Sequence, residues 1–149
     1  GEEHDPETHL IPLVLRAIVT GKPITIFGED YATPDGTCIR DYVHVNDLAD
    51  AHILALKYLL GGGKSCGINL ANSRGFSVKE VIAAAERVCG RSIATKLAPR
   101  RPGDPAILIG KTERAKALLG WTLSRSDLEL QVRDAWNWFK VHRQTAKTG

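Results

Sequence analysis

The stretch CIRDYVHVNDLADAH, from Cys38 to His52, gathers histidines and aspartates around an arginine and a tyrosine. Such side chains can bind a metal ion, act as an acid and a base, or hold an anion where a strand leads into a capped helix. A helix from Asp47 would turn Asp50 and His52 about 200° apart, so the two cannot converge on one ion. His44 and Asp47 alone are too few for a metal site. We therefore expect no metal in this chain.

The first half of this stretch favours anion binding when it is interpreted as a strand. Because side chains alternate along a strand, Arg40, Tyr42 and His44 would project to one face. A guanidinium and a phenol two residues apart can hold a phosphate group. Asn46 or Asp47 would then cap the helix that follows. A surface ion pair of Arg40 with a carboxylate is the alternative, and the residues alone leave both open.

The loop APRRPGDPA is a second candidate for anion binding. Its prolines stiffen the backbone, and Gly103 permits a tight turn. Arg100 and Arg101 suit a diphosphate through bidentate hydrogen bonds, and Asp104 suits sugar hydroxyls. A solvated basic turn explains the same residues equally well.

Composition and the remaining motifs exclude several classes of function. The run GGGKS lacks the first glycine of a phosphate-binding loop, since Tyr58 stands there, and no GxGxxG occurs. The net charge of +3 is spread along the chain, so no nucleic acid is expected. No apolar run approaches the roughly 18 residues of a membrane span. The three cysteines lie far apart, which indicates reduced thiols and a cytoplasmic protein.

Hydrophobic spacing and capping signals predict alternating helices and strands, hence an α/β or mixed α+β fold. Capping boxes are predicted at Ser77 with Glu80 and at Ser126 with Glu129. The glycines after residue 60 should end a helix. The expected helices cover 7–20, 46–60, 77–89, 112–119 and a stretch after Ser126, and the expected strands cover 24–28, 38–45 and 67–71.

Several long runs of this sequence resemble the carboxyl-terminal part of the UDP-glucose 4-epimerases, a family of extended short-chain dehydrogenases/reductases. These runs are DPETHLIPLVL, ITIFGEDYATPDGTCIRDYVHVNDLADAH, GINLANSRGFSVKEVI and APRRPGDPA. The resemblance implies that residues 1–142 form a UDP-sugar-binding domain with the last elements of a truncated Rossmann-type fold, followed by a flexible tail, 143–149. It also implies a longer enzyme that interconverts UDP-galactose and UDP-glucose by hydride transfer at the sugar C4.

The same resemblance assigns substrate-binding roles to particular residues. Arg40 and Arg101 would hold the diphosphate beside Tyr42, and Asp104 would receive the ribose hydroxyls. Leu108 would lie near the sugar ring, where leucine leaves room for some N-acetylhexosamines. Lys111 replaces an aspartate common in the family, which puts the cap of the next helix in doubt. The expected uracil and nucleotide contacts are Thr25, Ile26, Phe27, Leu10 and His9.

No catalytic residue is expected in this chain, because no tyrosine begins the YxxxK motif of the family. NAD would be bound mainly by an amino-terminal Rossmann domain that this chain lacks, so none is expected here and the chain alone should be inactive. That domain and a UDP-sugar are the expected partners. Surfaces left without the domain should make the chain a homo-oligomer or a domain-swapped assembly. The alternatives are an epimerase of UDP-pentoses or UDP-N-acetylhexosamines, and a non-catalytic nucleotide-sugar-binding module.

Overall fold

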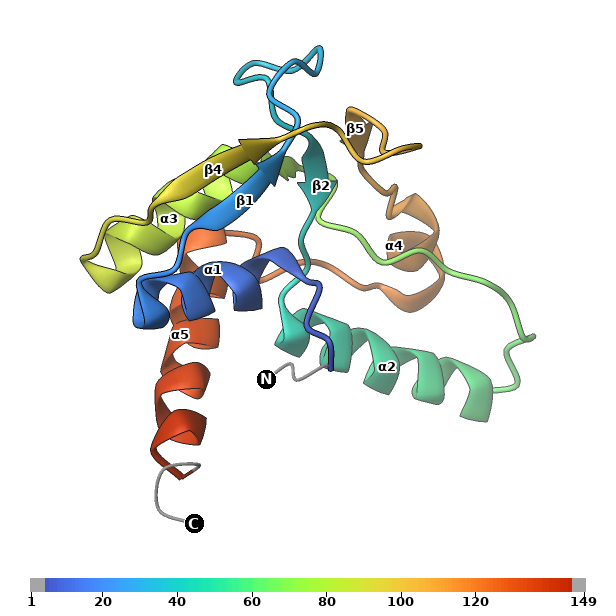
Figure 1. Cartoon of the computed structure of the whole chain (residues 1–149). Coiled ribbons are helices and arrows are strands. Elements are labelled where there is room, and N and C mark those ends of the chain that lie inside the picture. The colour runs from blue at the N-terminus through green and yellow to red at the C-terminus, as the bar shows by residue number, and fades with distance from the viewer. Residues whose placement is uncertain (1–4, 146–149) are drawn as a thin grey trace.

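The computed structural model describes residues 5–145 and begins with helix α1, Leu10–Thr20 (Figure 1). The helix starts later than predicted because His9 still has an extended backbone, with φ −82° and ψ 142°. Pro12 therefore lies in the first turn, where its missing N–H costs no hydrogen bond. Gly21 ends the helix with a φ of 68°, and its N–H donates to the Ala17 carbonyl. This helix forms one side of the cavity described below.

A two-stranded parallel sheet follows α1, formed by β1, Ile24–Phe27, and β4, Thr95–Ala98. Helices α3, Val78–Cys89, and α5, Leu128–Thr145, pack with α1 on one shared core. In Figure 1 the sheet lies above α1, with α3 behind it and α5 extending away below. The predicted tail, 143–149, begins inside α5 and ends outside the described residues. The buried members of this core are Val14, Leu15, Ala17, Ile18, Ile24, Ile26, Phe76, Val81, Ile82, Ala84, Ala85, Ile93, Leu128 and Val132.

A second sheet places β2, Ile39–Asp41, between two short strands. Strand β3, Gly75–Ser77, is antiparallel to β2, and β5, Ile107–Leu108, is parallel to it. The predicted strand 38–45 is therefore wrong beyond Asp41. The chain leaves the sheet there because His44 caps the next helix, and its ring accepts a hydrogen bond from the Asn46 N–H. Neither Asn46 nor Asp47 is the cap.

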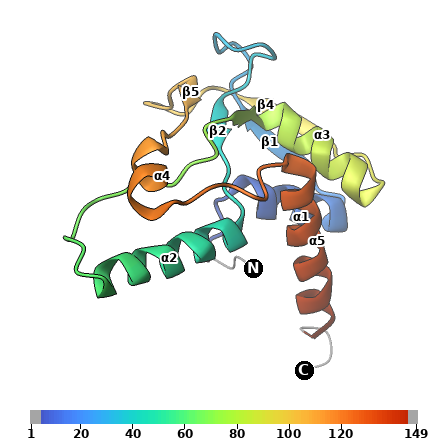
Figure 2. The same ribbon diagram turned by 180° about the vertical axis from the view of Figure 1, so that it is seen from behind.

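Helix α2, Val45–Leu60, forms a smaller second cluster with α4, Glu113–Leu119. Ala51, Ala115 and Trp121 are its buried residues. The predicted strand 67–71 is absent, since this segment runs past the cluster without ladder partners in the described chain. Figure 2 shows α2 projecting to one side of the molecule, with α4 above it. The other face of α2 exposes an apolar stripe: Val45, Ile53, Leu56 and Leu60.

Two helix starts test the capping predictions. At α3 the predicted capping box is confirmed, because Ser77 accepts from the Glu80 N–H and Glu80 accepts from the Ser77 N–H. At α5 the prediction is wrong, since Asp127 accepts from the Leu130 N–H at 2.8 Å. Glu129 instead forms an ion pair with Arg87 at 2.6 Å. The resulting architecture is a mixed α/β fold, as predicted. None of the described helices is long and apolar enough to cross a membrane.

Candidate functional site

A cavity with a volume of about 700 Å³ opens between α1 and β1. Leu10, Leu13 and Ala17 line it from α1, because residues three and four apart share one face of a helix. Thr25 and Phe27 line it from β1, two residues apart on one face of the strand. Further walls come from β2 and from the loop that follows β4. One helix face and one strand face thus meet in a wedge.

Arg40 is held on β2 at the wall of the cavity. Its Nη1 donates to the Ile39 carbonyl at 2.7 Å, and its Nη2 donates to the Asp104 Oδ1. Both side chains are mostly buried, with 22% and 25% of their surface exposed. Since β2 and the loop 98–106 are joined through β5, the ion pair links two segments that lie far apart in sequence. The pair places one cation and one anion side by side at the cavity wall.

The two adjacent arginines of the loop face different surroundings. The Arg101 guanidinium lies over the Phe27 ring at 4.1 Å and lines the cavity. The Arg100 guanidinium lies over the Tyr31 ring at 4.2 Å and pairs with Asp30 at 2.6 Å, outside the cavity lining. No ion pair of Arg101 is formed with a carboxylate in the described part of the chain. Arg101 therefore offers its charge to the cavity, whereas Arg100 is already engaged.

Tyr42 and Cys38 also line the cavity, and both are held in their protonated forms at neutral pH. Burial raises the pKa of Tyr42 to about 12. Burial likewise raises the pKa of the Cys38 thiol, although the positive charge of Arg40 acts in the opposite direction. A protonated phenol can donate a hydrogen bond but cannot act as a base. These two side chains are therefore suited to binding and not to proton abstraction.

The structure brings most of the predicted site residues to one place. Seven of them line the cavity: Leu10, Thr25, Phe27, Arg40, Tyr42, Arg101 and Asp104. Ile26 lies in the main core with 3% of its surface exposed, since it points to the opposite face of β1. Leu108 lies on β5, is 59% exposed and does not line the cavity. The placement of His9 is different again.

His9 precedes α1 and is linked to a neighbouring carboxylate. The Glu7 Oε1 accepts hydrogen bonds from the Thr8 and His9 N–H groups, at 2.9 and 2.8 Å, and lies 3.1 Å from the His9 Nδ1. Burial acts to raise the pKa of Glu7, but these hydrogen bonds hold it below its usual range. Glu7 and Thr8 line the cavity, whereas His9 does not. The sequence gives no signal for Glu7, because its role depends on the backbone turn before α1.

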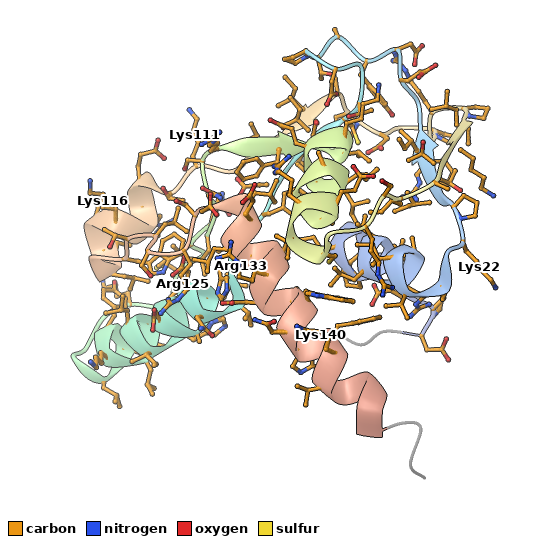
Figure 3. All side chains as sticks on the ribbon, turned by 90° about the vertical axis from the view of Figure 1, so that its left-hand side faces the viewer. Lys22, Lys111, Lys116, Arg125, Arg133 and Lys140 are labelled. Carbon is orange, nitrogen blue, oxygen red and sulfur yellow. The ribbon has the colours of Figure 1, made fainter. Side chains whose placement is uncertain are left out.

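Further lining residues were not anticipated from the sequence. Arg16 and Thr20 continue the helix face of Leu10, so helical spacing is the signal that could have identified them. Lys22 lies in the turn between α1 and β1, as Figure 3 shows. Val78, the first residue of α3, also lines the cavity. Of the metal-ligand types in 44–52, Asp47 and Asp50 share Arg125 as a partner, and no group of three or more such residues converges within the described chain.

Comparison with known proteins finds enzymes that resemble this chain in sequence and in fold. Residues 1–71 match the model of the NAD dependent epimerase/dehydratase family. The UDP-glucose 4-epimerase of Halalkalibacterium halodurans is 52% identical over 95% of this chain. A crystal structure of a UDP-glucose 4-epimerase superposes with a TM-score of 0.90 at 50% identity over 94% of the chain. The enzyme from Brucella ovis, solved with NAD, gives a TM-score of 0.88 at 44% identity over 93% of the chain.

In each of these comparisons the chain spans only 43% of the length of its relative. The match nevertheless extends over nearly all of this chain. The resemblance predicted from the sequence runs is confirmed, and so is the fold class. The amino-terminal 71 residues thus match the NAD dependent epimerase/dehydratase family, and nearly the whole chain is similar to UDP-glucose 4-epimerases.

Proposed function

We propose that this chain is the carboxyl-terminal, UDP-sugar-binding part of a UDP-glucose 4-epimerase, and that its cavity holds the UDP group. The longer protein would interconvert UDP-galactose and UDP-glucose in galactose metabolism, with NAD as the hydride carrier. The observation that carries the proposal is the convergence of Arg40 and Arg101 on one cavity from separate segments. The names of the relatives give the class of substrate. The three unpaired cysteines support a cytoplasmic location.

The cavity has the chemical features that a nucleoside diphosphate requires. Two guanidinium groups can bind the diphosphate through charge-assisted hydrogen bonds. Asp104 offers a carboxylate for the ribose hydroxyls next to the same arginine, Arg40. Thr25 and Phe27 line the β1 side, where the flat base would lie against an aromatic ring and the strand backbone. Tyr42 adds a protonated hydroxyl to the wall.

The described residues do not fit NAD. A dinucleotide site needs a glycine-rich turn that leads from a parallel strand into the amino terminus of a helix. Among the described elements, only β3 leads directly into a helix, and its junction is closed by the capping box of Ser77 and Glu80. The NAD of the family would therefore be held by the rest of the longer protein, which would also supply the hydride chemistry. We expect this chain alone to be inactive as an epimerase.

Sugar specificity is the part of the proposal that this cavity constrains least. Leu108 is exposed on β5 and does not border the cavity, so its side chain sets no limit on the bulk of the sugar within this chain. UDP-N-acetylhexosamines and UDP-pentoses therefore remain alternative substrates of the longer enzyme. Assays of that enzyme with each sugar would separate these alternatives.

Arg101→Ala is expected to weaken the binding of UDP about tenfold to a hundredfold, because it removes a charge-assisted contact with the diphosphate. Isothermal titration of the chain with UDP at moderate salt measures this. Arg100→Ala is the matched control, since it removes the same charge one residue away but from a side chain paired with Asp30. Equal affinities of the two variants, or no binding by the wild type, would contradict the proposal.

The apolar stripe of α2 is expected to make the isolated chain self-associate. Ile53, Leu56 and Leu60 are 53%, 58% and 79% exposed and lie on one face of α2, and a contiguous exposed apolar patch of this kind marks an interaction surface. In the longer enzyme this face would pack against the amino-terminal Rossmann domain. In the isolated chain a second copy would cover it, as a homo-oligomer or a domain-swapped assembly.

Sedimentation velocity tests this expectation. The wild type should sediment above the monomer mass, and Leu56→Glu with Leu60→Glu should shift it to the monomer. Leu118→Glu on α4, where the leucine is 39% exposed, is the control and should leave the assembly unchanged. A monomeric wild type with a cooperative melt would refute the expectation.

A further inference from the structure

Tyr31 is buried beside two segments that line the cavity. The residue is 5% exposed. One face of the ring carries the Arg100 guanidinium at 4.2 Å, and a Cβ placed on Gly28 would lie 2.7 Å from the Tyr31 Cε2. Gly28 follows Phe27, and Arg100 precedes Arg101, so the ring is packed between the two segments that line the cavity. A ring packed in this way fixes the position of its hydroxyl.

The Tyr31 hydroxyl is buried and has no hydrogen-bond partner among the described residues. Burial of a polar group without a partner is costly, and the great majority of buried hydroxyls in proteins have one. Burial raises the pKa of Tyr31, and the negative charge of Asp104 raises it further, whereas Arg100 and Arg40 lower it. The hydroxyl is therefore a protonated donor within electrostatic range of the Arg40–Asp104 ion pair. It donates to neither of them in this structure.

The ion pair is the part of the cavity wall that a diphosphate would disturb. In this structure the Asp104 Oδ1 accepts from Arg40. A diphosphate competes for the same guanidinium, and a carboxylate that is three-quarters buried then needs another donor. The loop that carries Asp104 also carries Arg100, which rests on the Tyr31 ring. The Tyr31 hydroxyl is a buried donor without a partner among the described residues, and its ring contacts this same loop through Arg100.

We propose that Tyr31 is a positioning residue of this cavity, whose hydroxyl donates a hydrogen bond to Asp104 when a bound diphosphate draws Arg40 away. The inference rests on the proposed function, because it takes the diphosphate of UDP as the group that competes for Arg40. Tyr31 itself does not line the cavity and acts through Asp104. The contact would hold the Asp104 carboxylate in place for the sugar hydroxyls of the ligand.

The first test compares melting temperatures of the ligand-free proteins. Tyr31→Phe removes only the hydroxyl, so its melting temperature should equal or exceed that of the wild type. Tyr58→Phe on α2, away from the cavity lining, is the matched control for the loss of a phenol oxygen. A melting temperature several degrees lower for Tyr31→Phe would show that the hydroxyl already has a partner in the free protein, and would overturn the proposal.

The second test measures the coupling of Tyr31 to Arg40 without any ligand. Arg40→Met leaves Asp104 without its cation, so Asp104 should then accept from Tyr31. Adding Tyr31→Phe in this background should lower the melting temperature by about 3 °C more than in the wild type, the shift of one ordinary hydrogen bond. Arg40→Gln serves as the background if Arg40→Met does not fold. Equal effects of Tyr31→Phe in both backgrounds would overturn the proposal.

The third test uses UDP as the ligand. Tyr31→Phe should weaken the binding of UDP about fivefold without lowering the melting temperature of the ligand-free protein. A residue with only a structural role would not give this combination of results. Unchanged affinity for UDP would overturn the ligand-dependent contact. If the wild type does not bind UDP, the proposed function fails, and the coupling to Arg40 still decides whether Tyr31 and Asp104 pair. If the wild type binds UDP but Tyr31 shows no coupling to Arg40, the proposed function stands and Tyr31 has no positioning role.

Discussion

Asp47→Ala is expected to lower the free energy of unfolding by about 3 to 5 kcal/mol, the usual effect of breaking a buried charged pair. Asp47 is 1% exposed. Its Oδ1 accepts from the Ser124 Oγ at 2.8 Å and from the Arg125 Nη1 at 3.0 Å, and its Oδ2 accepts from the Arg125 N–H at 3.0 Å. Alanine at this position would remove the acceptor of the Ser124 hydroxyl and of the Arg125 N–H, and would leave the Arg125 Nη1 with only the Ser124 Oγ and the exposed Asp50. The free energy of unfolding is measured by urea denaturation.

The position of this carboxylate explains why its loss should be costly. Asp47 lies in the first turn of α2 and fixes the segment between α4 and α5, which includes Arg125 (Figure 3). The Trp121 Nε1 also donates to the Asp47 carbonyl, at 2.8 Å. The second cluster has few buried residues, so these polar contacts supply much of the attachment of α2. Removing them should loosen α2 from α4 before the main core unfolds.

Asp50→Asn is the matched control, because Asp50 contacts the same Arg125 Nη1 at 3.3 Å but is 56% exposed. An exposed ion pair contributes about 0 to 1 kcal/mol. Equal losses of stability for the two variants would show that burial and the hydrogen bonds to the backbone are not the source of the effect.

The pH dependence of the free energy of unfolding gives an independent check on the contribution of Asp47 to stability. Burial acts to raise the pKa of Asp47, but the hydrogen bonds from Ser124 and Arg125 outweigh it and hold the pKa below its ordinary value of 3.8. A carboxylate with a lowered pKa in the folded state stabilises the protein above the pKa of the unfolded state. That stability should be present in full above about pH 4 and decline as the pH falls further. Asp47→Asn should flatten this acid-side decline.

Local signals in the sequence identified the elements whose ends depend on neighbouring residues. Ser77 and Glu80 cap α3 as their spacing predicts, and Gly21 ends α1. The prediction at α5 failed because two capping residues lie side by side. Asn72 donates to the Ser126 carbonyl at 3.0 Å, which holds Ser126 outside the helix and leaves Asp127 as the cap. Contacts of this kind, between segments distant in sequence, have no local signature.

The candidate site was predictable only in part, because it too depends on contacts between segments that are distant in sequence. Alternation along β1 and helical spacing along α1 each define one lining face, but neither says that the two faces meet. Strand β4, which pairs with β1 and leads into the loop of Arg101 and Asp104, has mostly exposed residues and no alternating apolar pattern, so the sequence does not predict it. The pairing of Arg40 with Asp104 was not predicted, because the family resemblance gave the two residues separate roles and the sequence alone suggested only an ion pair of Arg40 with an unspecified carboxylate. The burial of Asp47 depends on a partner 77 and 78 residues away.

Gly36→Ala is expected to destabilise the protein by about 3 kcal/mol or more, through strain and a clash that act together. Gly36 has a φ of 79°, a conformation that alanine rarely adopts. A Cβ at this position would lie 2.1 Å from the Glu29 carbonyl oxygen, which belongs to the backbone and cannot rotate away. Urea denaturation again gives the free energy of unfolding.

Gly21→Ala separates the strain from the clash. Gly21 has a φ of 68°, and nothing lies within 4 Å of a Cβ built there. Its replacement should therefore cost only the left-handed conformation, about 1 to 2 kcal/mol. Losses of similar size at the two positions would mean that the loop 28–37 moves to accept the methyl group.

The effect of Gly36→Ala also tests how firmly Tyr31 is held, because the loop 28–37 contains Tyr31 and contacts the start of α3. The Tyr31 N–H donates to the Gly36 carbonyl at 3.0 Å, and the neighbouring Asp35 accepts from the Ser77 hydroxyl at the start of α3. A loop held at both points cannot shift without moving Tyr31. A large loss for Gly36→Ala, beside a small one for Gly21→Ala, would therefore mean that the Tyr31 hydroxyl is rigidly placed. In that case Asp104, and not Tyr31, is the group that moves when a diphosphate takes Arg40.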